Sequence, residues 1–336
     1  MIKNYLEKVI EKENLSLDES YDAMDKIMSG EVNNILLSGF LIALKSKRET
    51  SDEIAGFAKA MRDKSIKINS EDAIDVCGTG GDSAGTFNIS TAVSFAVAGA
   101  GIKVAKHGNR SVSSNSGSAD VLRELGVNIE MNPAQSEKAL DQIGIAFLFA
   151  PLYHPAMKHA AETRKELGIR TVFNVLGPLT NPASVKRQMI GTFNNQAAKL
   201  LCDAAEKLEY ERIKIICNAN RYDEILLDDE TKIFEYEISS GRSDYTLSHQ
   251  DFNYLKIGKE NLYSSNSKES AKIILDVLNN NSANGAFHTV TANAAVALKC
   301  AGFSDSLAHC VDAAEASIKT GMAMQKLKDL IEFSKK

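Results

Sequence analysis

The first 64 residues show the apolar spacing of short amphipathic helices. Ile2, Leu6 and Val9 lie three or four positions apart, which places them on one face of a helix. The segment 35–44 repeats this spacing with larger apolar side chains. A polar stretch then breaks the pattern. We therefore predict a small helical unit at the start of the chain.

Short apolar runs separated by glycine-rich turns replace the helical spacing farther along. The runs at 73–77 and 102–105 predict buried strands, and the segment 88–100 between them predicts a helix. We expect a third strand at 127–129. A strand, a helix and a strand in this order are typical of a parallel α/β sheet.

The five prolines all lie between residues 133 and 182. Their clustering predicts a segment of loops and short helices. After it, the α/β pattern resumes with a helix over 195–209 and strands over 213–217 and 232–238. The Ser- and Asn-rich stretch that follows favours no element. The last helices are expected at 268–279, 291–301 and 308–334.

Composition narrows the class of protein. The chain has 336 residues, 44% hydrophobic and 25% charged, as in ordinary globular proteins of about two domains. The apolar content excludes a disordered chain, and the net charge of −5 disfavours a general nucleic-acid binder, which needs a basic surface. The windows 83–119 and 167–202 contain no Asp or Glu. Windows without acidic residues could surround a bound anion. They could equally be apolar segments of the core.

The cysteines and the apolar runs indicate the cellular compartment that we expect for the protein. Five cysteines form no CxxC pair, which suggests free thiols in a reducing compartment. The start of the chain fits an amphipathic helix rather than a signal peptide, and the apolar run at 92–105 is too short to span a membrane. We therefore expect a cytoplasmic protein with no membrane association.

Two polar motifs follow the first predicted strand. Gly78-Thr-Gly-Gly-Asp82 lies between a strand and a helix, where glycines let backbone N–H groups close around phosphate oxygens. A plain tight turn is the alternative. Asn88-Ile-Ser-Thr91 places three small polar side chains at the start of the next helix. One of them could be an ordinary N-cap, whereas three together suit a ribose, a phosphate or metal-bound water.

A basic loop and an acidic pair follow later strands. Lys106-His-Gly-Asn-Arg110 runs into the Ser- and Gly-rich segment 111–118, and of the six histidines only the one in this loop is predicted to be functional. Because open α/β sheets bind ligands at the carboxyl ends of strands, the loop predicts the second half of a phosphate site, with a flexible serine loop as the alternative. Asp223 and Glu224 are hard oxygen ligands that suit Mg²⁺ held together with substrate phosphates, or else a solvated acidic surface.

Five motifs occur in a fixed order, namely Gly78-Thr-Gly-Gly-Asp82, Asn88-x-Ser-Thr91, Lys106-His-Gly-Asn-Arg110, Ser116-Gly-Ser-Ala-Asp120 and Arg170-Thr-x-Phe-Asn-x-Leu-Gly-Pro-Leu-x-Asn-Pro182. Together they closely resemble the anthranilate phosphoribosyltransferase family over nearly the whole chain. The resemblance implies transfer of a phosphoribosyl group from phosphoribosyl pyrophosphate to the amine of anthranilate, releasing pyrophosphate, in tryptophan biosynthesis. It implies Mg²⁺ as cofactor, and catalysis by positioning and charge stabilisation with no general acid or base assigned.

The resemblance also carries residue roles onto this chain. The phosphoribosyl donor would be held by Gly78, Gly81, Asp82, Thr86, Asn88, Ile89, Ser90, Thr91, Lys106, His107, Gly108, Asn109, Arg110, Ser111, Val112, Ser113, Ser114 and Ser118. Anthranilate would contact Gly78, Asn109, Arg164, Gly177 and Pro178. The metal would be bound by Ser90, Asp223 and Glu224. An Arg suits a flat carboxylate, whereas without the resemblance Arg164 would be a charge on a surface helix.

The implied architecture is a small all-helical N-terminal domain and a larger α/β domain with a mainly parallel central sheet. The helical domain would comprise residues 1–67 and 132–183, and the donor-binding α/β domain residues 68–131 and 184–336. An excursion of the chain into the helical domain would explain the clustering of the prolines. Relatives usually dimerise through the helical domain, so a homodimer is expected.

Two positions depart from the family pattern, and two other functions compete. The segment Asn218-Ala-Asn-Arg-Tyr222 stands where relatives usually have glycine, which affects how the metal-binding carboxylates are presented. Asn115 replaces a residue that is often basic in relatives.

Pyrimidine nucleoside phosphorylase shares the implied architecture, but its lysine-serine-threonine and serine-glycine-arginine motifs are absent here. A noncatalytic, nucleic-acid-binding branch of the fold would need a broad basic surface.

Overall fold

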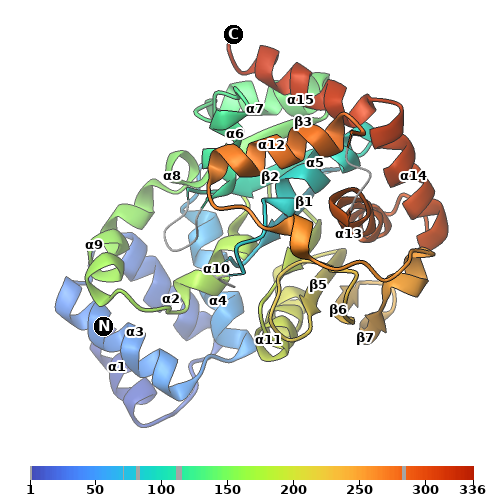
Figure 1. Ribbon diagram of the computed structural model, residues 1–336. Helices are drawn as coiled ribbons and strands as arrows, with labels where there is room; N and C mark the ends of the chain where they lie inside the picture. Colours follow the sequence, from blue (N-terminus) through green and yellow to red (C-terminus); the bar gives the residue numbers. More distant parts are fainter. Residues whose placement is uncertain (1, 71, 81–83, 111–115, 282–284) are drawn as a thin grey trace.

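The computed structural model describes residues 2–70, 72–80, 84–110, 116–281 and 285–336, and shows a helical body beside a larger α/β body (Figure 1). The N-terminal body consists of α1 (Ile2–Ile10), α2 (Leu17–Met28), α3 (Asn34–Lys47) and α4 (Ser51–Asp63). The later helices are α5 (Ile89–Gly99), α6 (Ser118–Glu124), α7 (Pro133–Gln142), α8 (Ala150–Tyr153), α9 (Lys158–Leu167), α10 (Phe173–Leu176), α11 (Asn195–Ala205), α12 (Ser267–Leu278), α13 (Gly285–Ala301), α14 (Leu307–Lys319) and α15 (Met322–Phe333). The strands are β1 (Ile74–Gly78), β2 (Val104–Gly108), β3 (Ile145–Phe149), β4 (Arg187–Gly191), β5 (Arg212–Asn218), β6 (Thr231–Glu237) and β7 (Gly241–Leu247). Within the described ranges, no helix is both long and apolar enough to cross a membrane.

The described residues form one seven-stranded sheet in the order β3-β2-β1-β4-β5-β6-β7. Strands β1 to β5 run parallel, and β6 and β7 are antiparallel to their neighbours. The predicted class, a helical N-terminal domain with a larger α/β domain around a mainly parallel sheet, is therefore confirmed. From β1 the chain adds β2 and β3 on one side and then returns to add β4 on the other. In open α/β sheets such a reversal leaves a ligand-binding crevice at the carboxyl ends of the two central strands.

Helices cover both faces of the sheet (Figure 1). On one face α5 and α13 pack together and contact β1, and α15 packs on α5. On the other face α11 contacts both β5 and α4, so the helical body packs directly against the sheet domain. Along β5, Ile213 and Ile215 belong to the apolar cluster that includes α4, whereas Ile216 belongs to the cluster around α5. Side chains of β5 therefore point alternately to the two faces of the sheet, and both faces are buried.

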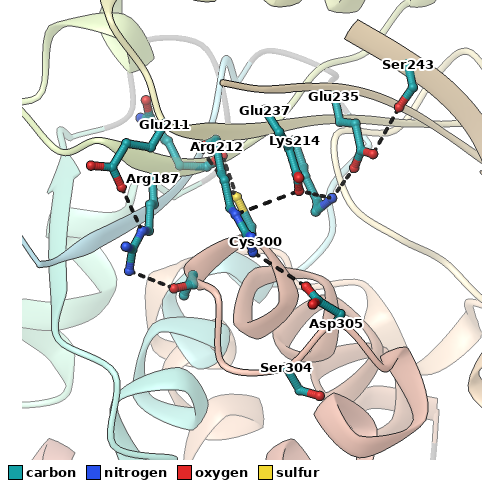
Figure 2. A network of polar contacts seen from close by, with 12 residues as sticks. Arg187, Glu211, Arg212, Lys214, Glu235, Glu237, Ser243, Cys300, Ser304 and Asp305 are labelled. Carbon is teal, nitrogen blue, oxygen red and sulfur yellow. Dashed lines mark hydrogen bonds and ion pairs between the residues drawn. The ribbon is translucent and has the colours of Figure 1, made fainter. Parts of the chain in front are cut away.

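A polar network fixes the end of the sheet where β4 and β5 begin (Figure 2). Arg187 donates to the carbonyl oxygen of Ala301, the last residue of α13, at 2.9 Å and pairs with Glu211 at 3.2 Å. Lys214, whose side chain is 1% exposed, pairs with Glu235. Burial opposes ionisation of Glu235, but this ion pair lowers the pKa of its carboxyl below the usual value. The network ties β4, β5, β6 and α13 together at the end opposite the crevice.

The structure corrects three expectations about individual elements. Residues 127–129 form no strand. The third parallel strand along the chain is β3, which lies inside the proline-bearing segment assigned to loops and short helices. The helix expected over 308–334 is divided into α14 and α15, because Gly321 between them adopts a φ of +80°, which ends the first helix. Strands β4 and β7 were not predicted: β4 begins with two polar residues, and β7 is a largely polar edge strand.

The proline-bearing segment divides between the two bodies. Helix α7 and strand β3 belong to the α/β body, because β3 pairs with β2 and α7 packs against β3. Helix α9 packs against α2 and α3 in the helical body. The excursion expected over 132–183 therefore begins after residue 149 rather than at 132. The physical reason is the run of five buried apolar residues in β3, which can be buried only in the sheet.

Helices α2 and α4 cross at close range in the helical body. Capping boxes at Ser16 and Thr50 begin the two helices. Gly56 of α4 lies against α2, where a Cβ atom would come within 2.3 Å of the Leu17 carbonyl oxygen and 2.7 Å of Ser20 Cβ. A larger residue at position 56 therefore requires α2 to move.

We predict that Gly56→Ala lowers the free energy of unfolding by about 1–3 kcal/mol, because the added methyl group overpacks the contact between α2 and α4. Gly39→Ala in α3 is the matched control, since its Cβ would meet Leu6 Cδ2 at 3.7 Å, an ordinary contact distance. That substitution should stabilise the protein by about 0.5–1 kcal/mol, because glycine is unfavourable within a helix. Urea unfolding measures both changes, and equal effects would contradict the close approach.

Candidate active site

A cleft of about 770 Å³ opens at the carboxyl ends of β1 and β2, at the crevice that the strand order creates. Residues from both bodies line it. The sheet domain contributes the ends of β1 and β2, the start of α5 and the loop after β5. The other side is formed by α8, α9, α10 and the 3₁₀ turn η2 (Gly177–Thr180), and Met61 of α4 also lines the cleft. The cleft therefore lies between the two bodies.

The structure brings together most of the residues that the family resemblance assigns to the two substrates and the metal. The described ones that line the cleft are Gly78, Thr86, Asn88, Ile89, Ser90, Lys106, His107, Gly108, Asn109, Arg110, Ser118, Arg164, Gly177, Pro178, Asp223 and Glu224. Gly81, Asp82, Ser111, Val112, Ser113 and Ser114, and also Asn115, lie outside the described residues. Thr91 is fully buried in α5 and does not line the cleft.

Lys106 is a buried basic residue that lines the cleft. Its Nζ atom donates to the carbonyl oxygen of Val76 at 2.7 Å and to Ser90 Oγ at 3.2 Å. Burial lowers the pKa of Lys106, and the nearby Asp75 acts against this shift. Lys106 thus fixes the Ser90 hydroxyl at the start of α5. It also places a basic side chain at the carboxyl end of β2, next to the start of α5.

Asp75 supports the same strands from inside the sheet, and the sequence pattern did not single it out. Its carboxylate is fully buried and accepts hydrogen bonds from the His107 backbone N–H at 3.2 Å and from Gln188 Nε2 at 3.0 Å. Burial raises the pKa of Asp75, and the charge of Lys106 opposes that rise. A charged residue within an apolar strand was the available signal, because a buried carboxylate requires donors around it.

Two glycines make room for the acidic pair. A Cβ atom on Gly78 would lie 2.5 Å from Asp223 Oδ2, and one on Gly191 would lie 1.7 Å from the Asp223 carbonyl oxygen. The end of β1 and the end of β4 must therefore be glycine if Asp223 is to reach the cleft. Thr86 Oγ1 donates to Glu224 Oε1 at 3.3 Å, which orients the second carboxylate.

The donor set of the cleft fits Mg²⁺. Asp223, Glu224 and Ser90 all line the cleft, and their side chains carry the hard oxygen atoms that this ion prefers. Among the described residues, no group of three or more His, Cys, Asp or Glu side chains is positioned to hold a metal. A magnesium ion prefers such a partial set, because it keeps several water or phosphate ligands.

The loop before Asp223 keeps a glycine-like backbone without glycine. Ala219 and Asn220 adopt φ values of +49° and +53°, the left-handed region that favours glycine. Asn220 Oδ1 accepts a hydrogen bond from the Asn195 backbone N–H at 2.8 Å, and Asn218 Nδ2 donates to Thr231 Oγ1 at 2.9 Å. These contacts hold the departure from the family pattern in the conformation that presents Asp223 to the cleft.

Arg164 lies on the helical side of the cleft and is half-buried. Its guanidinium carbon lies 5.1 Å from the centre of the Phe173 ring, and burial lowers its pKa. Arg164 forms no ion pair with an acidic side chain in the described part of the chain. A guanidinium placed over an aromatic ring in this way suits a planar carboxylate ligand.

Two histidines meet in the cleft, of which the sequence pattern predicted only His107. The ring centroids of His107 and His154 lie 5.2 Å apart, and the Nε2 atoms of both are buried with no hydrogen-bond partner among the described residues. Burial lowers the pKa of His107 to about 3 and that of His154 to about 4. Both rings are therefore neutral at pH 7. His154 had no motif to mark it, because only the fold brings α8 to β2.

Comparisons with known proteins identify the class. A model for the helical bundle domain of a glycosyl transferase family matches residues 3–65, and one for the a/b domain of such a family matches residues 70–324. Fold and cleft together are thus those of a glycosyl transferase.

Similar proteins identify the family within this class. The anthranilate phosphoribosyltransferase of Petrotoga mobilis is 44% identical over 99% of this chain and 97% of its own. The structure of the anthranilate phosphoribosyltransferase from Thermus thermophilus has a TM-score of 0.92 at 34% identity, over 98% of this chain and 99% of that one. The Saccharomyces cerevisiae enzyme in complex with PRPP and Mg has a TM-score of 0.89 at 28% identity, over 99% and 98%. Its complex with 4-fluoroanthranilate has a TM-score of 0.87 at 26% identity, over 99% and 98%. The chain belongs to the anthranilate phosphoribosyltransferase family.

The neutral histidines predict a specific pH dependence of stability. Below pH 6.5 the unfolded chain protonates His154, whereas the folded protein does so only near pH 4, so the stability of the folded state falls as the pH decreases through this window. One such group contributes up to about 1.4 kcal/mol per pH unit. We predict that His154→Asn flattens the dependence of the free energy of unfolding on pH between 4 and 6.5. Urea unfolding at several pH values measures this slope, and parallel profiles for the variant and the wild type would contradict a neutral His154.

Proposed function

We propose that the protein transfers the phosphoribosyl group of phosphoribosyl pyrophosphate to the amine of anthranilate, giving phosphoribosylanthranilate and pyrophosphate in tryptophan biosynthesis. One observation carries this proposal. One side of the cleft has a phosphate-type site at the ends of β1 and β2. The facing side carries Arg164, which forms no ion pair with an acidic side chain among the described residues. Family membership and the ligands of the yeast structures support the same substrates.

The sheet side of the cleft would bind the donor. The end of β1 at Gly78 and the start of α5 at Asn88 present backbone and small polar groups to phosphate oxygens. Lys106 places a basic side chain next to the start of α5. We retain the donor-binding roles carried over for Gly81 and Asp82 and for the residues 111–114, which lie outside the described residues.

Asp223, Glu224 and Ser90 would hold Mg²⁺ between them and the donor. When bound, Mg²⁺ neutralises charge on the departing pyrophosphate. The chain's own contribution is to orient these oxygens: Thr86 donates to Glu224, and Lys106 fixes the Ser90 hydroxyl. Such preorganised charge lowers the barrier without a general acid or base.

The helical side would bind the acceptor. Arg164 would pair with the carboxylate of anthranilate, and Gly177 and Pro178 would flank its ring. The neutral rings of His107 and His154 add no positive charge and can accept hydrogen bonds through Nε2. Anthranilate would then be held between the two bodies with its amine toward the donor.

We further propose that the protein is a homodimer through the helical domain and works in the cytoplasm. Ile35 on α3 is 84% exposed and Ile42 on the same helix 48%, which supports an apolar contact surface there. All five cysteines are free thiols, as suits a reducing compartment. A solution mass of one chain in analytical ultracentrifugation would overturn the dimer.

The activity is tested directly with the purified protein. Mg²⁺, phosphoribosyl pyrophosphate and anthranilate together should cause loss of anthranilate fluorescence. Omission of the donor should prevent that loss, because no phosphoribosyl group is then available for transfer. Chelation of Mg²⁺ should also prevent it, because the charge of the departing pyrophosphate is then not neutralised. Stable fluorescence in the complete mixture would refute the proposed reaction.

We predict that Arg164→Ala raises the KM for anthranilate by about tenfold to a hundredfold, because a charge-assisted contact to the carboxylate is lost. The KM for the donor should stay within about twofold. Lys165→Ala is the matched control, since Lys165 is the next residue on α9 and is exposed. Steady-state kinetics with each substrate varied in turn gives both constants. Equal changes in both KM values would show that Arg164 does not bind the carboxylate.

A further inference from the structure

The turn η2, which forms the wall of the cleft beside Arg164, is anchored from two directions. Gln188 Nε2 donates to the Pro178 carbonyl oxygen at 2.7 Å. Arg62 Nε, from α4, donates to the Leu179 carbonyl oxygen at 2.6 Å. The carbonyl oxygens of two consecutive residues of η2 are therefore held by side chains from two different elements, β4 and α4.

Gln188 is the anchor that belongs to the centre of the sheet. It lies on β4 directly opposite Asp75 of β1 and is fully buried. Its Nε2 atom faces Asp75 Oδ2 at 3.0 Å and Cys77 Sγ at 3.3 Å as well as the Pro178 carbonyl oxygen. The same amide nitrogen thus joins the acceptor wall to the strand that ends at the donor site.

The direction of donation in this network is fixed by chemistry. Arg62 can only donate, and its Nη2 donates to Tyr210 Oη at 2.7 Å. The Tyr210 hydroxyl therefore donates onward to Gln188 Oε1 at 2.6 Å, which leaves the Gln188 amide nitrogen for the two acceptors, Asp75 and Pro178. A continuous chain of donors runs from α4 of the helical body through the sheet to η2. The amide of Gln188 is the group in this chain that bonds both the sheet and the wall.

We propose that Gln188 is a positioning residue that sets the distance between the acceptor wall, η2, and the donor-binding end of β1. The inference rests on the proposed function, because it assigns anthranilate to the η2 side of the cleft. Gln188 lines no part of the cleft and acts through Pro178, which does. Without the amide, the Pro178 carbonyl loses its buried donor, and the wall shifts relative to Arg164 and His107. Asp75 of β1 loses one donor as well, but the donor site keeps the hydrogen bond from the His107 backbone N–H to Asp75 and those from Lys106 to Val76 and Ser90.

The first test is kinetic. Gln188→Met keeps the length and volume of the side chain but removes its donor and acceptor. We expect it to raise the KM for anthranilate by about five- to tenfold, as for loss of a buried hydrogen bond, and to leave the KM for phosphoribosyl pyrophosphate within about twofold. Gln188→Asn is the second variant: its amide is one methylene group shorter, so it withdraws from the Pro178 carbonyl oxygen but keeps a polar group at this position in the sheet. It should reproduce the shift in KM if Gln188→Met fails to fold.

Tyr210→Phe is the matched control, because it removes a hydroxyl from the same buried chain and leaves the Gln188–Pro178 hydrogen bond in place. It should raise the KM for anthranilate less than the Gln188 variants do. A Gln188 variant that folds but changes neither KM, or both KM values equally, would overturn the positioning role. So would an equal effect of Tyr210→Phe.

A readout that needs no substrate separates this inference from the proposed function. Hydrogen–deuterium exchange of the folded Gln188 variants should be faster over residues 177–182 than in the wild type, with a smaller change over β1, where Asp75 keeps the hydrogen bond from the His107 backbone N–H. If the variants exchange faster there while the wild type consumes no anthranilate, the proposed reaction is refuted but the anchoring of η2 is retained. Unchanged exchange over 177–182 would overturn the anchoring whatever the activity.

Discussion

The buried amide of Gln188, which bonds both Asp75 of β1 and the Pro178 carbonyl oxygen, is the contact that joins the sheet side of the cleft to its wall. Burying a carboxylate is costly unless donors surround it, and here the Gln188 amide and the His107 backbone N–H supply them. The same two donors belong to the groups that build the cleft. His107 continues to the basic loop after β2, and Gln188 holds Pro178 of the acceptor wall. Satisfying one buried carboxyl group therefore fixes the end of β2 and the wall η2 relative to each other.

The distribution of charge follows the same division. The acid-free windows 83–119 and 167–202 contribute the start of α5, the end of β2 and the wall η2 to one cleft. In the described part of the chain, the carboxylates that line this cleft are those of Asp223 and Glu224. A protein with a net charge of −5 thus keeps most of its acids away from the place where a small polyanion would bind. The windows are better explained by the cleft than by apolar core segments alone.

The elements that the sequence predicted well are those with a local signal. Helical spacing identified α1 and α3, and apolar runs next to glycine turns identified β1 and β2. Strand β3 was missed because prolines on both sides of it resemble a loop segment, and β4 because Gln188 interrupts its apolar pattern. Gln188 must be polar because it hydrogen-bonds to the buried Asp75. That partner is 113 positions away in the chain, so no short window of the sequence reveals the pairing.

The sequence by itself determined the family and the contiguous motifs, because a glycine loop before a helix has its hydrogen-bonding capacity built into neighbouring residues. Tertiary structure decided what depends on burial and on distant contacts. Gly191 had to be glycine because Asp223 lies against it, and His154 is neutral because packing removes water from its ring. Desolvation and close approach are properties of the packed chain, since they arise only when segments far apart in sequence come together.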